Sequence, residues 1–142
     1  MLSEKIKKYF HEKRFLPNPE IEKYKQVLIE LNVPLESAFA EFNLTTIGPT
    51  FIGRKGIREI QNVCWFKIYS NYDYSLEILK KFNIPKHYLP ISSFESDSVI
   101  LYDIDKDAVI DFSFDKLKLL LENKIEPNWK TFNDFLEWYF EL

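Results

Sequence analysis

The sequence has 142 residues, enough for one domain and hardly enough for two. Apolar residues make up 46% of it and aromatic residues 17%, and this composition excludes an intrinsically disordered chain. The net charge of −3 argues against general affinity for nucleic acid or for anionic membranes. Three glycines are too few to favour a glycine-rich loop that binds phosphate.

Cysteine usage and the lack of long apolar runs indicate where the protein works. Cys64 is the only cysteine, so no intramolecular disulfide can form, which fits a reducing cytoplasm. Charges occupy the N-terminal positions where a signal peptide needs an apolar run. The longest uncharged stretch, residues 42–53, is shorter than the roughly 18 apolar residues of a membrane span. We therefore expect a cytoplasmic monomer or small homo-oligomer with no membrane partner.

The N-terminal third predicts three helices. Apolar residues recur at helical spacing in residues 4–13, 19–32 and 35–42. Asn18 is a suitable N-cap for the second helix, and Pro34 is expected to open the third. The buried face of the third helix is predicted to contain Leu35, Ala38, Phe39 and Phe42.

The middle of the chain predicts extended structure followed by a short helix. The helical period is lost between residues 45 and 69, and the β-branched and aromatic runs at 57–60 and 63–69 predict strands. Ser75 is then expected to cap a helix, which ends at the Asn-Ile-Pro sequence of residues 83–85.

The last part of the chain predicts three strands and two further helices. The strands are expected at residues 88–92, 98–104 and 108–112, and the aspartate-rich turn between the last two is typical of a hairpin. Residues 114–123 return to helical spacing, and Thr131 caps a final amphipathic helix. This order predicts an α+β fold in a single domain, residues 1–142. In this fold we expect an antiparallel meander that is packed by the N-terminal and C-terminal helices.

Cys64 could act as a nucleophile with His11 or His87 as its base. A structural role is the stronger interpretation, because Cys64 lies in an apolar run, where a free cysteine behaves as a small hydrophobic residue. Neither histidine has an acidic neighbour at a recognisable spacing, and two histidines with one cysteine make a poor zinc site.

Asp103, Asp105 and Asp107 resemble the start of a calcium-binding loop. That loop needs glycine at its sixth position and glutamate at its twelfth, where this chain has Ala108 and Phe114. A solvated hairpin is the simpler interpretation, so we expect no bound metal and no cofactor.

Acidic residues are concentrated between residues 95 and 115, where seven acids stand against one lysine. In an alternating strand that no bulge interrupts, Asp103, Asp105, Asp107 and Asp111 would share one face. A partner with a basic surface would relieve their mutual repulsion and would be attracted quickly. An ordinary solvated face is an equally good interpretation. The segment contains Glu95, Asp97, Asp103, Asp105, Asp107, Asp111 and Asp115.

Aromatic residues gather near the C-terminus at helical spacing, which favours a role in the core over a binding groove. Trp138 lies off the main apolar stripe and is the best candidate for an exposed binding anchor. The group consists of Trp129, Phe132, Phe135, Trp138, Tyr139 and Phe140.

Three stretches carry a family resemblance. Residues 31–42 (LNVPLESAFAEF) are similar to a leucine–proline step into a helix that ends in an aromatic residue. Residues 84–91 (IPKHYLPI), with the strands at 99–103 and 108–111, are similar to a strand trio with an acidic residue at a strand end. Residues 129–140 (WKTFNDFLEWYF) look like a closing helix. In this order they resemble the SUKH superfamily of bacterial immunity proteins and related regulatory modules.

The resemblance implies a non-catalytic immunity protein that binds and neutralises a cognate toxin such as a nuclease or deaminase. The family offers no shared catalytic residues to carry over. A regulatory or scaffolding module of the same fold is the alternative, and a small hydrolase that uses carboxylates is a third possibility. Our candidate residues for contact with a basic protein partner are Glu95, Asp97, Asp105, Asp107 and Trp138.

Overall fold

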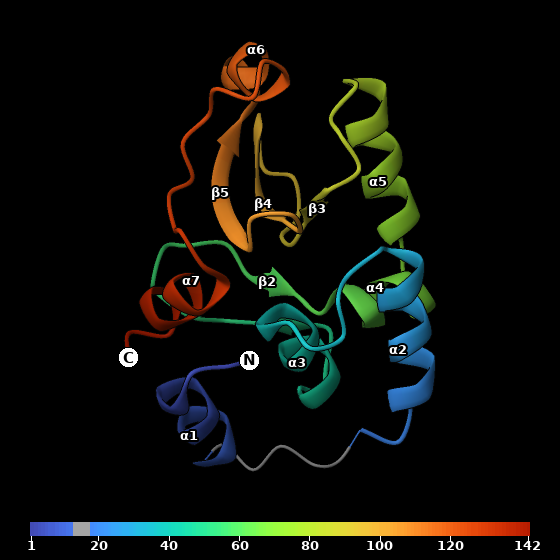
Figure 1. Cartoon of the computed structure of the whole chain (residues 1–142), viewed down its shortest axis with the longest axis vertical. Helices are drawn as coiled ribbons and strands as arrows, with labels where there is room; N and C mark the ends of the chain where they lie inside the picture. Colours follow the sequence, from blue (N-terminus) through green and yellow to red (C-terminus); the bar gives the residue numbers. More distant parts are fainter. Residues whose placement is uncertain (13–17) are drawn as a thin grey trace.

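Three helices open the chain: α1 (Glu4–Glu12), α2 (Ile21–Glu30) and α3 (Ala38–Thr45). The computed structural model describes residues 1–12 and 18–142, so Lys13, at the end of the first predicted helix, lies outside the described residues. Ile6 and Phe10 of α1 are buried, and α1 packs against α7 (Phe132–Tyr139), which brings the two ends of the chain together (Figure 1).

Two of the predicted helix starts are displaced. The Asn18 side chain accepts a hydrogen bond from the amide of Glu20, at 2.9 Å, in a turn just before α2, and Glu20 takes the N-cap position. The third helix begins at Ala38 and not after Pro34, because the Ser37 hydroxyl accepts the amide proton of Ala40. Leu35 therefore lies before the helix and is exposed, so its predicted burial was wrong.

The predicted strand over residues 63–69 is wrong, because these residues form helix α4 (Val63–Tyr69). The Asn62 side chain caps it by accepting a hydrogen bond from the amide of Trp65, at 3.0 Å. Val63 and Cys64 are fully buried, and α4 packs on α2. This burial overrides the strand preference of the β-branched and aromatic residues.

Extended structure in this region is limited to a short antiparallel pair. Strands β1 (Thr50–Phe51) and β2 (Ile60–Gln61) pair so that Phe51 is opposite Ile60. The strand expected over residues 57–60 is thus present only at its last residue. The short pair lies between the helices and the main sheet (Figure 1).

Two buried asparagines join α3 to α4. Asn43 accepts the amide proton of Val63 at 2.9 Å and donates to the carbonyl of Phe39. Asn62 donates to the carbonyl of Asn43 at 3.0 Å. Because each buried polar group has a partner, this contact fixes the angle between the two helices without leaving an unpaired amide.

Helix α5 (Tyr72–Lys81) begins before the expected cap at Ser75, which lies inside the helix. Its end agrees with the prediction, since Asn83 adopts a φ of 60° directly after it. Among the residues that the structure describes, no helix is both long and apolar enough to cross a membrane.

The main sheet confirms the predicted antiparallel meander. It contains β3 (Tyr88–Pro90), β4 (Ser98–Asp103) and β5 (Ala108–Ser113), in the order β3-β4-β5. One face packs into the core shared with α3 and α7, where the ring of Phe39 stacks on Tyr102 at 4.1 Å. The other face packs against Leu79 of α5 and Leu120 of α6.

The predicted C-terminal helices are confirmed. A short 3-10 turn (Phe114–Lys116) leads into α6 (Leu117–Leu121), and the Thr131 side chain caps α7 at the amide of Asp134. The chain is therefore an α+β domain whose sheet is covered by helices on both faces (Figure 1).

Candidate functional site

The four predicted acidic contact residues lie at opposite ends of one hairpin. Glu95 and Asp97 precede β4, whereas Asp105 and Asp107 lie in the turn that follows it. The six residues of β4 separate the two groups by about 17 Å, given a rise of about 3.4 Å per residue. The acidic segment of the sequence therefore contributes to two separate surfaces.

The expectation that the aspartates share a face is wrong. Asp103 is opposite Ala108 and Ile100 is opposite Asp111 in the register of β4 and β5. Asp103 and Asp111 therefore point to opposite faces of the sheet. The reason is the turn, which shifts the alternation between the two strands.

Two acids of the turn, Asp103 and Asp107, accept hydrogen bonds that stabilise it. Asp103, which is 2% exposed, accepts hydrogen bonds from the amides of Asp105 and Lys106, at 2.9 and 3.2 Å. The Asp107 carboxylate accepts the hydroxyl proton of Tyr102 at 2.8 Å; the burial of Tyr102, and after it this bond, raises the pKa of the phenol. Of the two predicted contact residues in the turn, Asp105 is thus the freer one.

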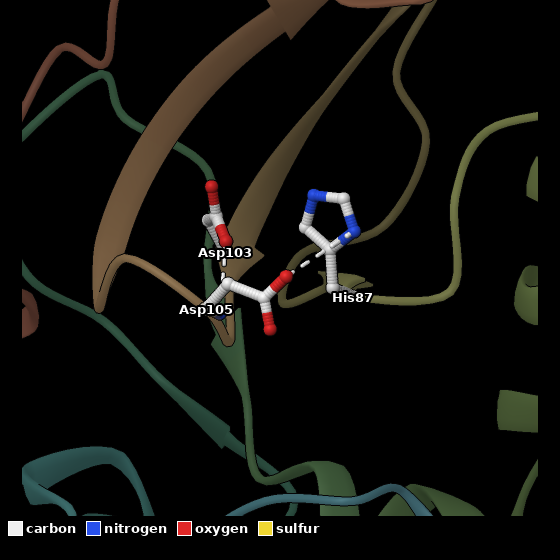
Figure 2. A group of neighbouring side chains, drawn as sticks. All are labelled: His87, Asp103 and Asp105. Atoms are coloured by element: carbon white, nitrogen blue, oxygen red, sulfur yellow. Dashed lines mark hydrogen bonds and ion pairs between the residues drawn. The ribbon is translucent and has the colours of Figure 1, made fainter. Parts of the chain in front are cut away.

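His87, Asp103 and Asp105 form the one group among the described residues that could hold a metal ion (Figure 2). The His87 carbonyl accepts a bond from the amide of Ile104, which brings the histidine beside the turn, and its Nδ1 lies 3.8 Å from Asp105 Oδ2. The three ligand atoms lie within 4.8 Å of one another, whereas two ligand atoms of a tetrahedral zinc ion lie about 3.4 Å apart. The hydrogen bonds that Asp103 accepts in the turn are enough to explain why it lies here without a metal ion.

A concave site lies near the other end of the hairpin, beside α7. We call it the tryptophan hollow; its volume is about 190 Å³. It brings together two of the predicted contact residues, Glu95 and Trp138, which are far apart in sequence. The residues that line it are Gly56, Ile57, Arg58, Glu95, Ile100, Asp111, Trp129 and Trp138.

Two tryptophans form the aromatic part of the hollow. Trp129 is held beside β5 by two backbone hydrogen bonds with Val109, of 2.9 and 3.1 Å. Its ring centroid lies 4.8 Å from that of Trp138, which is half-buried near the end of α7 and not exposed as predicted. The guanidinium carbon of Arg54 lies 4.6 Å from the Trp138 centroid, so this ring already binds a cation.

Arg58 and Asp111 form the ion pair of the hollow. Arg58 Nη2 lies 2.7 Å from Asp111 Oδ1, and Nη1 donates to the hydroxyl of Ser98. The Arg58 side chain is 13% exposed, and its Nε is buried without a partner. Sequence reasoning missed Arg58, because only the packing of the loop before β2 on the sheet places it here.

The positions of Cys64 and of a second cavity also bear on possible chemistry. Cys64 is fully buried on α4, where burial raises the pKa of its thiol to about 12, as suits a packing role.

A cavity of about 510 Å³ lies where α2 and α5 meet the segment before β3. Leu31, Leu76 and Ile84 are among the residues that line it, and none of the predicted contact residues is.

No family model, no curated protein and no solved structure matches this chain.

Proposed function

We propose that the protein is a non-catalytic immunity protein, which binds a cognate toxin with a basic surface and thereby neutralises it. The observation that carries the proposal is the tryptophan hollow, where Glu95 and Trp138 meet although 43 positions separate them. Aromatic side chains beside charged groups are typical of the residues that dominate binding energy in protein interfaces.

The charge distribution supports a basic partner. Glu95, Asp97 and Asp105 are exposed, and the chain as a whole carries a charge of −3. An acidic surface speeds the approach of a basic toxin, and a nuclease that binds nucleic acid through lysines and arginines has such a surface. Binding there would cover the basic residues that the nuclease needs for its substrate.

Co-expression with the product of the adjacent gene tests this function directly. We expect the neighbouring protein to arrest growth when it is expressed alone, and we expect this chain to restore growth and to co-purify with it. Growth arrest that this chain does not relieve, or a harmless neighbour, would count against immunity and in favour of a regulatory module of the same fold.

A charge reversal then tests the surface. Glu95→Lys should weaken rescue because it places a positive charge beside the basic partner. The matched control is Glu36→Lys, which makes the same change at an exposed position before α3. Asp105→Lys examines the other end of the hairpin and is preferable to a change at Asp107, which would remove the partner of the Tyr102 hydroxyl. Equal rescue by all variants would show that the contact lies elsewhere.

A further inference from the structure

We infer that the tryptophan hollow receives a lysine or arginine side chain of the partner protein. The inference rests on the proposed function, since it names the chemistry of one contact between the two proteins. It is drawn from the size of the hollow, from its aromatic walls and from the balance of charges around it.

The size of the hollow favours a single side chain over a free small molecule. Its volume is about 190 Å³, whereas pockets for drug-sized ligands and cofactors usually measure about 300–1,000 Å³. A side chain that is delivered by a protein surface needs only such a small recess, because the surrounding interface supplies the remaining contacts.

The walls suit a long side chain with a positive end. The rings of Trp129 and Trp138, together with the exposed Ile57, offer apolar surface to the methylene groups of a lysine or arginine. Tryptophan is also the aromatic residue that attracts cations most strongly. Trp138 shows this property within the structure, where the guanidinium of Arg54 lies against its ring.

The charges favour a cation over an anion. Glu95 is exposed and has no ion pair among the described residues, and the Asp111 side chain is 52% exposed beside its bond to Arg58. Among the described residues that line the hollow, Arg58 is the only cation, and Arg54, which contacts the Trp138 ring, is paired with Glu141 at 3.6 Å. One N–H of each terminal nitrogen of Arg58 already donates, to Ser98 and to Asp111, so the charge of Arg58 is paired within the hollow and the Glu95 carboxylate is left as its unpaired charge.

A titration followed by nuclear magnetic resonance tests the occupant without the toxin. The probes are the N-acetyl amides of arginine, lysine and norleucine, the last of which has the lysine stem without its charge. We expect the indole N–H signals of Trp129 and Trp138 to shift saturably with the two basic probes and not with norleucine. The signal of Trp65, on α4, serves as an internal control and should not move.

Two substitutions test whether an acid of the hollow contributes to binding of the basic probes. Glu95→Gln should weaken binding of the basic probes by up to about fivefold, which is the range of an exposed ion pair. Asp115→Asn removes an exposed acid of the same segment that does not line the hollow, and it should leave the affinity unchanged.

Three results would overturn the inference: no saturable shift with any probe, equal shifts with norleucine, or the same affinity after Glu95→Gln. Any of these results combined with growth rescue in the co-expression test would reject the occupant and leave the immunity function in place. Binding of the basic probes without growth rescue would reject the immunity function instead.

Discussion

Single side chains explain how distant parts of this chain are held together. The hydroxyl oxygen of Tyr139 lies 2.8 and 2.7 Å from the carbonyl oxygens of Phe51 and Arg58, which share its one proton, and this contact fixes the loop between β1 and β2 to α7. The amide of Arg54 donates to the Tyr139 carbonyl at 2.7 Å. This loop contributes Arg58 to the tryptophan hollow, so the shape of the hollow depends on these contacts.

Gly53 is the one of the three glycines at which an added Cβ atom would meet other atoms. A Cβ atom at this position would lie 2.4 Å from the Tyr139 ring and 2.5 Å from its carbonyl oxygen. We expect Gly53→Ala to lower the free energy of unfolding by about 1–3 kcal/mol, the usual effect of overpacking. Urea denaturation would measure it, with the exposed neighbour Ile52→Ala as the control. Equal stability of the two variants would contradict the contact.

Cys64 makes stability depend on pH in the alkaline range. Burial raises its pKa from 9.0 to about 12, so the thiol ionises in the unfolded chain before it ionises in the folded chain. Stability is therefore lost as the pH rises above the ordinary thiol value, by up to about 1.4 kcal/mol per pH unit from this group. Denaturation between about pH 9 and 11 should show a shallower loss for Cys64→Ala than for the natural chain. Parallel losses would show that the thiol does not contribute.

At the scale of elements, local patterns predicted the strands better than the central helices. The β-branched runs at residues 98–104 and 108–112 and the aspartate turn between them predicted the hairpin correctly. The run from Val63 to Tyr69 has the composition of a strand, and only its packing against α2 makes it a helix. Asn62 was the available signal, since asparagine is a good N-cap.

The cap at Asn62 gives a prediction for α4. Asn62→Ala removes the bond to the Trp65 amide and leaves the Asn43 carbonyl without its donor in a buried place. We expect a loss of about 2–3 kcal/mol in the free energy of unfolding. Asn71→Ala is the matched control, because Asn71 is the N-cap of α5 and makes no capping bond there. Losses of the same size would contradict the special role of Asn62.

At the scale of the whole molecule, the candidate site could be predicted only in part. The sequence indicated Glu95 and Trp138 through charge and through an off-stripe aromatic residue. It could not indicate that Arg58 and Asp111 pair beside them, because the four residues come from separate segments that only tertiary packing brings together. The length of β4 separates Asp105 from Glu95, although both belong to one acidic segment of the sequence.

The most direct test of the proposed function is a calorimetric titration of the purified protein with the toxin encoded by the adjacent gene. Immunity by stoichiometric binding predicts a one-to-one complex with a dissociation constant of about 1 nM or below. Glu95→Lys should weaken the complex more than Glu36→Lys does. A titration without a saturable heat signal, while the toxin remains active in the presence of the protein, would contradict the proposal.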